Sequence, residues 1–303
     1  MATMTAAPTP QQTTSRPMEG KTVMATGASL GIGRVTALEL ARMGARVVMV
    51  CRNPDKGQAV RTEIIRSSGN DAVELMIADL GSQDQIRALA NDFLATHDRL
   101  DVLVNNAGAL NMRRTTTVDG YETTFAVNHL GYFLLTNLLL DLLKRSAPSR
   151  IVNVSSRAHL NGHINFDDLN CEKRYAAGRA YGQSKLANVL HAYELARRLE
   201  GTGVTVNALH PGVVRTGFGR NNAGVVGALF GVAQVVGRAF YVSEEKGART
   251  SVYLASSPEV EGVTGKYFSL CREAQSSAES HDTGVARRLW DVSEEMTRPR
   301  TSA

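Results

Sequence analysis

A tyrosine and a lysine four residues apart form the first pair in the sequence that is suited to catalysis. Tyr181 and Lys185 stand in the run YGQSK at the beginning of a helical pattern, so their side chains share one helix face. An ammonium beside a phenol favours the phenolate and lowers the tyrosine pKa from about 10 toward the range of a general acid or base. Tyr175 competes for this role, but Arg179 follows it by four residues where a lysine is needed. Such a pair is usually incidental by itself, but its position after a predicted strand and a glycine-rich loop favours Tyr181 as the general acid/base.

A glycine-rich run supplies the second chemical feature, a cradle for phosphate. The letters TGASLGIG, residues 26–33, join a short apolar run to a helical pattern. Glycines let the chain turn sharply and bring backbone N–H groups close to a pyrophosphate at a helix N-terminus, where the helix dipole favours negative charge. The spacing is GxxxGxG and not the common GxGxxG. The predicted cofactor-binding residues of this run are Gly27, Ser29, Leu30, Gly31, Ile32 and Gly33.

The second apolar run ends in a basic residue where an NAD site would carry an acid. An Asp or Glu at this position binds the adenosine ribose hydroxyls and repels a 2′-phosphate. The run VCRN, residues 50–53, contains no acid, and Arg52 offers a guanidinium to a phosphate. Arg52 with Asn53 therefore predicts NADP(H) in preference to NAD(H), and Arg34 and Lys56 are secondary candidates. The alternative is that Arg52 is a solvated surface residue.

Two further apolar runs end in residues suited to a nucleotide. Asp79, followed by Leu80, can accept a hydrogen bond from an adenine amino group, or it can cap the next helix. The small and amide-bearing residues Asn106, Ala107 and Gly108 allow a close approach to a cofactor, although NxxG is also an ordinary turn. We include all five among the predicted cofactor-binding residues.

These motifs require strands that end at one edge of a sheet, and the chain has the matching pattern. Short β-branched runs alternate with longer amphipathic stretches, as in repeated βαβ units, and several runs are almost continuously apolar, as in parallel strands covered on both faces. The expected strands are 21–26, 46–51, 73–78, 100–105, 150–155, 204–209 and 266–270. The expected helices are 32–43, 55–67, 83–97, 118–145, 179–200 and 244–256. The sequence therefore predicts an α/β protein with a Rossmann-type, doubly wound parallel sheet of about seven strands in a single domain.

Composition excludes several other classes of protein. The 303 residues are 43% hydrophobic and 21% charged, which argues against a disordered or fibrous chain. The net charge of +5 is scattered over the chain, so no nucleic-acid partner is expected. Three cysteines without CxxC spacing indicate free thiols and a cytoplasmic location. Residues 1–18 lack the apolar core of a signal peptide, and the apolar stretch 223–236 is too short to cross a bilayer. We expect no transmembrane anchor.

Taken in order, the motifs resemble those of the short-chain dehydrogenase/reductase family over residues 18–275. They are TGASLGIG, Asp79-Leu80, NNAG, FAVNHLG with Asn128, IVNVSS with Ser156, YGQSK and Pro211-Gly212. Several longer runs, among them SSRAH, HPGVVRT and LWDVSEE, resemble the retinol dehydrogenase-like branch. The 25-residue separation of Ser156 and Tyr181 is longer than in compact family members and matches that branch.

The resemblance implies a role for each matching residue. Tyr181 exchanges a proton with the substrate oxygen, Ser156 orients that oxygen in preference to Ser155, and Lys185 lowers the Tyr181 pKa and binds the nicotinamide ribose. Asn128 holds a water that links Lys185 to solvent; a helix-kink amide is its alternative reading. The nicotinamide side is lined by Pro211, Gly212, Val214 and Thr216. Hydride comes from the nicotinamide.

The expected reaction is hydride transfer between NADP(H) and a carbonyl or alcohol carbon of a small hydrophobic aldehyde, ketone or alcohol. An apolar lid over about residues 212–240 would set specificity. The expected division is a disordered leader (1–18), a catalytic domain (19–275) and a C-terminal helix or tail (276–303). Two alternatives remain, a C=C reductase of the protochlorophyllide type and a non-catalytic NADP(H)-sensing protein.

Metals and subunit pairing are secondary questions. His159 and His163 lie near two aspartates, but no HExxH accompanies them and the chemistry needs no metal, so none is expected. The family commonly pairs subunits through its two long helices, here 118–145 and 179–200. The apolar stripe containing Leu134 and Leu138 fits either a homodimer or an internal core.

Overall fold

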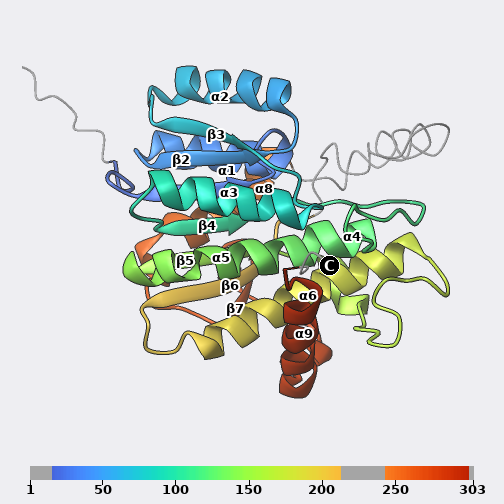
Figure 1. Cartoon of the computed structure of the whole chain (residues 1–303). Coiled ribbons are helices and arrows are strands. Elements are labelled where there is room, and N and C mark those ends of the chain that lie inside the picture. The colour runs from blue at the N-terminus through green and yellow to red at the C-terminus, as the bar shows by residue number, and fades with distance from the viewer. Residues whose placement is uncertain (1–15, 213–242, 300–303) are drawn as a thin grey trace, which may run out of the picture.

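Eight strands form one sheet in the computed structural model, which describes residues 16–212 and 243–299 (Figure 1). The strand order is β3-β2-β1-β4-β5-β6-β7-β8, and all neighbours are parallel except β7 and β8. The strands are β1 (Thr22–Thr26), β2 (Arg46–Cys51), β3 (Val73–Ile77), β4 (Val102–Asn105), β5 (Ser149–Val154), β6 (Val204–His210), β7 (Lys266–Ser269) and β8 (Arg272–Glu273). The predicted doubly wound sheet is confirmed. The first seven strands are the predicted ones, and the two-residue β8 is too short to leave an apolar pattern.

Helices cover both faces of this sheet. One face carries α3 (Gln83–Thr96), α5 (Gly131–Arg145) and α6 (Ala177–Arg198), and the other carries α1 (Gly31–Arg42), α2 (Pro54–Ser68) and α8 (Glu244–Ser256) (Figure 1). In β1, Met24 packs in the core beneath α3, α5 and α6, whereas Val23 and Ala25 pack in the core beneath α1, α2 and α8. Successive side chains of a strand point to opposite faces of the sheet. Burial on both sides explains why the strands are almost continuously apolar.

The connection between β4 and α5 differs from the predicted helix over 118–145. Residues 116–122 form a turn closed by a bridge between Thr116 and Glu122. The buried Glu122 carboxylate accepts hydrogen bonds from the main-chain N–H groups of Thr124 and Phe125, which fixes the helix start. The chain then forms α4 (Thr123–Phe125), a π-helix η1 (Ala126–Leu130) and α5. The predicted start was wrong because Val118 is 82% exposed and has no core to pack against.

The C-terminal part of the chain packs onto the long helices. Helix α9 (Thr283–Met296) places Trp290 against Phe133 of α5, with ring centroids 4.8 Å apart, and the Arg198 guanidinium of α6 lies 4.1 Å above the indole ring. Leu134 and its neighbours on α5 belong to the internal core. Helix α9 therefore covers part of the surface through which we expected subunits to pair. Short 3₁₀ helices complete the described chain: η2 (Arg157–Asn161), η4 (Pro258–Val260) and η5 (Ala278–His281).

Among the described residues, one helical stretch is long and apolar enough to cross a membrane. This stretch is Thr123–Arg145, and 72% of its most apolar window is buried inside the fold. Such burial is typical of the core helix of a sheet protein.

Candidate active site

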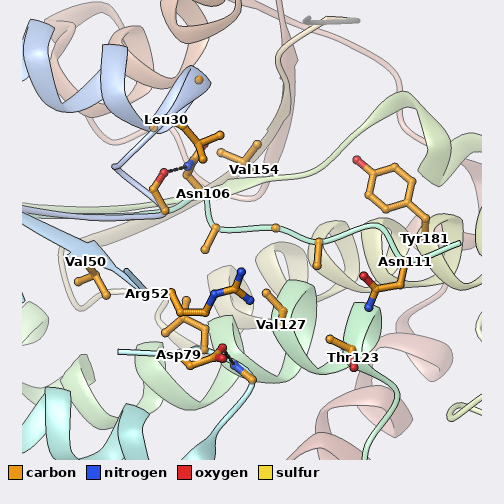
Figure 2. Close-up of a pocket in the computed structure, with 18 of the residues that line it drawn as sticks. Leu30, Val50, Arg52, Asp79, Asn106, Asn111, Thr123, Val127, Val154 and Tyr181 are labelled. Carbon is orange, nitrogen blue, oxygen red and sulfur yellow. Dashed lines mark hydrogen bonds between the residues drawn. The ribbon is translucent and has the colours of Figure 1, made fainter. Parts of the chain in front are cut away.

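A cavity of about 890 Å³ lies at the carboxyl ends of the parallel strands, beside β1 and β4, where the strand order reverses. Its volume falls in the range of about 300–1,000 Å³ that is typical of small-molecule sites. Figure 2 shows Arg52 and Asp79 toward one end of the cavity and Tyr181 and Asn111 toward the other. We call these the nucleotide end and the catalytic end.

Most of the predicted site residues line this cavity. They are Gly27, Ser29, Leu30, Gly31, Ile32, Gly33, Arg52, Asp79, Leu80, Asn106, Ala107, Gly108, Ser156, Tyr181, Lys185, Pro211 and Gly212. Asn53 and Asn128 lie outside the lining. Val214, Thr216 and nearly all of the predicted lid lie outside the described residues.

The glycine-rich run forms a turn in which Gly27 and Gly33 have no room for a side chain. Gly27 has a φ of +66°, and a Cβ there would lie 2.7 Å from the Cα of Ala107. A Cβ on Gly33 would overlap the Gly27 carbonyl and the Asn106 amide. The first turn of α1 has no side-chain cap at Leu30 and no acidic residue. No carboxylate therefore occupies the N–H groups at the start of α1, which belongs to the cavity wall. These groups are available to an anion such as pyrophosphate.

The end of β4 is fixed to the end of β1 by hydrogen bonds. The Thr26 hydroxyl accepts from the main-chain N–H groups of Asn106 and Ala107, and the Asn106 side-chain amide donates to the Thr26 carbonyl at 2.8 Å. Tyr132, which is fully buried, donates to the Ala107 carbonyl at 2.7 Å. These bonds hold the NNAG run against the glycine turn and give Asn106 a structural task.

Some charged and polar side chains at the nucleotide end already have hydrogen-bond or ion-pair partners, and others do not. Arg52 is exposed, and its guanidinium makes no hydrogen bond or ion pair with any residue that the structure describes. Asn53 caps α2 by accepting from the Lys56 N–H at 2.9 Å. Arg34 pairs with Glu63 and Glu244, at 2.6 and 3.3 Å, and does not line the cavity. Of the basic candidates, only Arg52 faces the cavity with a free charge among the described residues.

Asp79 does not cap the following helix. Its Oδ1 accepts from the Gly81 N–H at 2.9 Å within the turn, and the N-cap of α3 is Ser82, which accepts from the Gln85 N–H. The capping alternative is therefore wrong. The carboxylate lies at the cavity wall with capacity to accept further hydrogen bonds.

Three segments bring Ser156, Tyr181 and Lys185 together at the catalytic end. The Tyr181 hydroxyl lies near enough to the Ser156 side chain for Ser156 to lower its pKa. Ser155 also lines the cavity, but it is buried and its hydroxyl donates to the main-chain carbonyl of Lys185 at 2.6 Å, so it braces α6. The Lys185 ammonium donates to the Val154 carbonyl at 2.9 Å and lies 5.8 Å from the centre of the Tyr181 ring.

Burial governs the pKa values of this pair in the chain alone. It raises the pKa of Tyr181 to about 12, against a smaller lowering by the Ser156 hydrogen bond, and it lowers the pKa of Lys185 to about 7. Lys185 is not among the groups that shift the Tyr181 pKa in the chain alone, where its ammonium is directed at the Val154 carbonyl. Its lowering of the Tyr181 pKa stays a prediction.

Asn128 lies in the π-helix and joins three segments. Its Oδ1 accepts from the Ala109 N–H at 2.7 Å, and its Nδ2 donates to the Ala109 carbonyl and to the Ser184 hydroxyl. Both amide protons are used, so the side chain can only accept a further bond. The kink reading of Asn128 agrees with this geometry, and a water relay stays a prediction.

The competing candidates do not reach the reacting end. Tyr175 donates to the Asn111 carbonyl at 2.6 Å and does not line the cavity. His163 pairs with Glu279, whereas His159 contacts Ser156 and Ser277. No group of metal-binding side chains occurs within 16–212 and 243–299.

Several parts of the lining were missed from the sequence, among them Gly81, Ser82 and Gln85 at the start of α3. Asn111, Thr115, Thr116 and Thr117 follow NNAG on the loop between β4 and α4, and Arg157 follows Ser156. The loop was missed because the helix was predicted to begin at 118. Its signal was the run of three threonines after a strand end, which favours extended backbone.

The fold, the glycine turn at its reversal point and the Tyr181–Lys185 pair define a dinucleotide-binding α/β oxidoreductase. A model of the short chain dehydrogenase family matches residues 21–224, and the chain belongs to this family. Within it the chain is similar to the retinol dehydrogenases. Human retinol dehydrogenase 14 is 50% identical over 294 residues, covering 92% of this chain and 87% of the relative, and human retinol dehydrogenase 13 is 50% identical over 275 residues, covering 89% and 82%.

Solved structures share the fold. An uncharacterized protein from Mycobacterium paratuberculosis is 36% identical with a TM-score of 0.75, covering 92% of this chain and 94% of that one. Pseudomonas aeruginosa RhlG, in an active-site complex with NADP, is 28% identical with a TM-score of 0.66, covering 84% and 96%. The family uses a nicotinamide cofactor and transfers hydride to or from a small molecule. The glycine turn and the uncapped start of α1 fit such a cofactor.

Proposed function

We propose that the protein transfers hydride between NADP(H) and the carbonyl or alcohol carbon of a hydrophobic aldehyde, ketone or alcohol. The observation that carries the proposal is that the Tyr181 and Ser156 side chains and buried Lys185 line the same cavity as the glycine turn. A carbonyl oxygen placed between the two hydroxyls would receive one hydrogen bond from each.

The described residues are suited to the proton half of the reaction. In reduction, a bound nicotinamide would supply hydride to the carbonyl carbon. Tyr181 supplies the proton to the oxygen, because its raised pKa keeps the hydroxyl protonated at neutral pH. Ser156 holds the oxygen in place. Lys185, with a pKa near 7, is suited to return a proton to Tyr181 at the same pH, and the Asn128 region is where a water would connect it to solvent.

Selection of NADP(H) rests on Arg52. The end of β2 carries no acid, and the guanidinium has no partner among the described residues. Residues 1–15, 213–242 and 300–303 contain no Asp or Glu side chain that would neutralise it. A 2′-phosphate would therefore meet an available bidentate donor.

The substrate class rests on relatives and composition. The relatives that are half identical are named retinol dehydrogenases, and the predicted lid contains seven Val and three Phe residues. A cytoplasmic location is part of the proposal, because Cys51, Cys171 and Cys271 are free thiols, as in a reducing compartment. Any homodimer would use a surface other than the part of α5 and α6 that α9 covers.

NADPH oxidation with a panel of substrates tests the proposal. The panel contains medium-chain aldehydes, aromatic aldehydes, retinal and cyclic ketones, each measured with NADPH, with NADH and with the Tyr181→Phe variant. We expect turnover that prefers NADPH, with kcat lower by at least about 10³-fold in the variant, because the proton donor is lost. NADPH affinity should change little.

Other outcomes point to the alternatives. Tight NADPH binding without carbonyl turnover, but with reduction of an activated C=C bond, would replace the proposal with an olefin reductase. NADPH binding with no turnover of either kind would favour a sensing protein.

A further inference from the structure

The segment that carries Ser156 is held by the C-terminal part of the chain, outside the matched family region. We call residues 276–281, which include η5, the C-terminal arm. Its Ser276 hydroxyl bonds to Tyr193 of α6 at 2.9 Å, and Glu279 accepts from the Ile164 N–H at 2.9 Å. The arm therefore contacts both α6 and the segment 156–164.

His159 connects this arm to Ser156. Its ring is fully buried between the two, with Nδ1 2.7 Å from the Ser156 carbonyl and Nε2 3.2 Å from the Ser277 main-chain nitrogen. The Ser277 N–H can only donate, so Nε2 must accept. The single proton of the neutral ring is then on Nδ1, where its partner, a carbonyl oxygen, can only accept. Both bonds require the same tautomer.

The other side of the segment is held by a close backbone contact. A Cβ on Gly162 would overlap the carbonyl of Gly182, the residue after Tyr181. The segment 157–162 is thus held between the α6 turn that carries Tyr181, which Gly162 contacts, and the C-terminal arm, which His159 contacts. Its position sets the separation of the Ser156 and Tyr181 hydroxyls.

We propose that His159 is a positioning residue for Ser156 and that the Ser277 N–H selects the tautomer with which it works. This inference rests on the proposed function, in which Ser156 orients the substrate oxygen. The Tyr267 ring packs on His159 with centroids 4.7 Å apart, and its hydroxyl lies 3.4 Å from Nδ1, where it can accept as the Ser156 carbonyl does. His210 and Arg157 are the other ionisable groups near it. Burial lowers the pKa of His159, so that the ring is neutral at physiological pH.

Nitrogen NMR of the full-length protein labelled with ¹⁵N-histidine tests the tautomer directly. We expect one neutral ring with the proton on Nδ1 and no titration between pH 6 and 8, assigned to His159 by its loss in His159→Asn. A proton on Nε2 in the wild type would overturn the inference. This measurement needs no turnover, so it stands even where the proposed function fails.

Two substitutions of His159 separate its two bonds. Asparagine places a donor near the Nδ1 position, whereas glutamine reaches the Nε2 position. We expect His159→Asn to keep kcat within about threefold and His159→Gln to lower it about 10- to 100-fold, with the KM for NADPH unchanged in both, because a misplaced orienting group costs rate and not cofactor binding. His163→Asn, on the same segment, is the control that leaves kcat unchanged. The reverse order of the two variants at 159 contradicts the inference.

A pair of substitutions at Ser277 tests the arm. Ser277 has a φ of −64°, which proline adopts, and its hydroxyl has no partner in the described part of the chain. Ser277→Pro removes the N–H donor together with the unpartnered hydroxyl, and we expect a mixture of His159 tautomers and a kcat about threefold to tenfold lower. Ser277→Ala keeps the donor and should match the wild type. Equal behaviour of the two variants would show that the arm does not act on His159.

The two proposals fail in different ways. A wild type that turns over no member of the substrate panel overturns the proposed function. Amide hydrogen exchange of residues 157–162 then decides the inference. It is supported if the amides lose protection in His159→Gln and Ser277→Pro but keep it in His159→Asn and Ser277→Ala. Equal protection in all four variants overturns it.

Discussion

The two ends of the cavity are built in different ways. The nucleotide end consists of main-chain N–H groups and the exposed charge of Arg52, each within a few residues of a strand end. The catalytic end consists of buried groups with shifted pKa values, and its hydroxyls and ammonium are held by residues from remote segments. Local chain geometry therefore makes the nucleotide end, whereas long-range packing makes the catalytic end.

The sharpest test of this comparison is at the catalytic end, where two adjacent serines have different tasks. Ser156→Ala removes the hydroxyl beside Tyr181 and should lower kcat about 10²- to 10³-fold, as loss of one preorganised donor does. Ser155→Ala removes the bond to the Lys185 carbonyl and should cost about 1 kcal/mol of unfolding free energy, with a much smaller loss of kcat. Steady-state kinetics and urea unfolding of both variants measure this. Equal kcat losses would mean that the two serines share one role.

The next test is at the nucleotide end, where the backbone leaves no room. A Cβ in Gly33→Ala would overlap the Gly27 carbonyl and the Asn106 amide, so we expect NADPH affinity to fall about 100-fold and the melting temperature to fall by several degrees. Gly178→Ala is the control, because that position in α6 is open and the substitution should stabilise by about 0.4–1 kcal/mol. Fluorescence titration with NADPH reports the affinity. Undiminished NADPH affinity in the Gly33 variant would show that the close packing at Gly33 is not needed for cofactor binding.

The difference between the ends also explains what was predictable from the sequence. The strands and the glycine turn were predictable because each is written in contiguous residues: an apolar run, then glycines, then a helical pattern. Helix α8 has the predicted bounds because Ser243 caps it and two acidic residues fill its first turn. Arg52 was found by its place at a strand end.

The rest depends on contacts that no local pattern encodes. Sequence spacing suggested that Lys185 acts on Tyr181, but it could not show that burial dominates both pKa values. The brace from His159 to Ser277 joins residues 118 apart. The helix start at Thr123 depends on Glu122, whose carboxylate is fully buried as a cap. Asn53, predicted to bind cofactor, was recruited as a helix cap.

Acid should affect the catalytic end through the core beneath it. Burial lowers the pKa of His191 to about 4 and that of its neighbour His129 to about 3, whereas an exposed histidine titrates near 6.5. Between pH 4 and 6.5 the unfolded chain therefore binds more protons, so stability is complete above pH 6.5 and is lost as the pH falls toward 4. His191 alone should cost about 2 kcal/mol at pH 5 relative to pH 7.5.

The His191→Gln variant isolates this contribution. Its unfolding free energy should fall less than that of the wild type between pH 7.5 and 5, with the gap near 2 kcal/mol, because glutamine does not titrate. Urea unfolding at both pH values measures the gap. Parallel losses in wild type and variant would place the acid sensitivity elsewhere in the chain.

The smallest expected effect is the exchange of cofactor preference at Arg52. Arg52→Ala should lower the kcat/KM ratio of NADPH over NADH about tenfold, since a charge-assisted hydrogen bond contributes about 1.5–3 kcal/mol and solvent exposure reduces that value. Arg34→Ala is the matched control: its guanidinium is paired with Glu63 and Glu244 away from the cavity, so it should leave the ratio unchanged. A shift in the Arg34 variant, or none in the Arg52 variant, would mean that the 2′-phosphate is recognised by other groups. The predicted shift appears only in the preference ratio, because Arg52 touches neither Ser156 nor Tyr181, and the two ends of the cavity then prove separable.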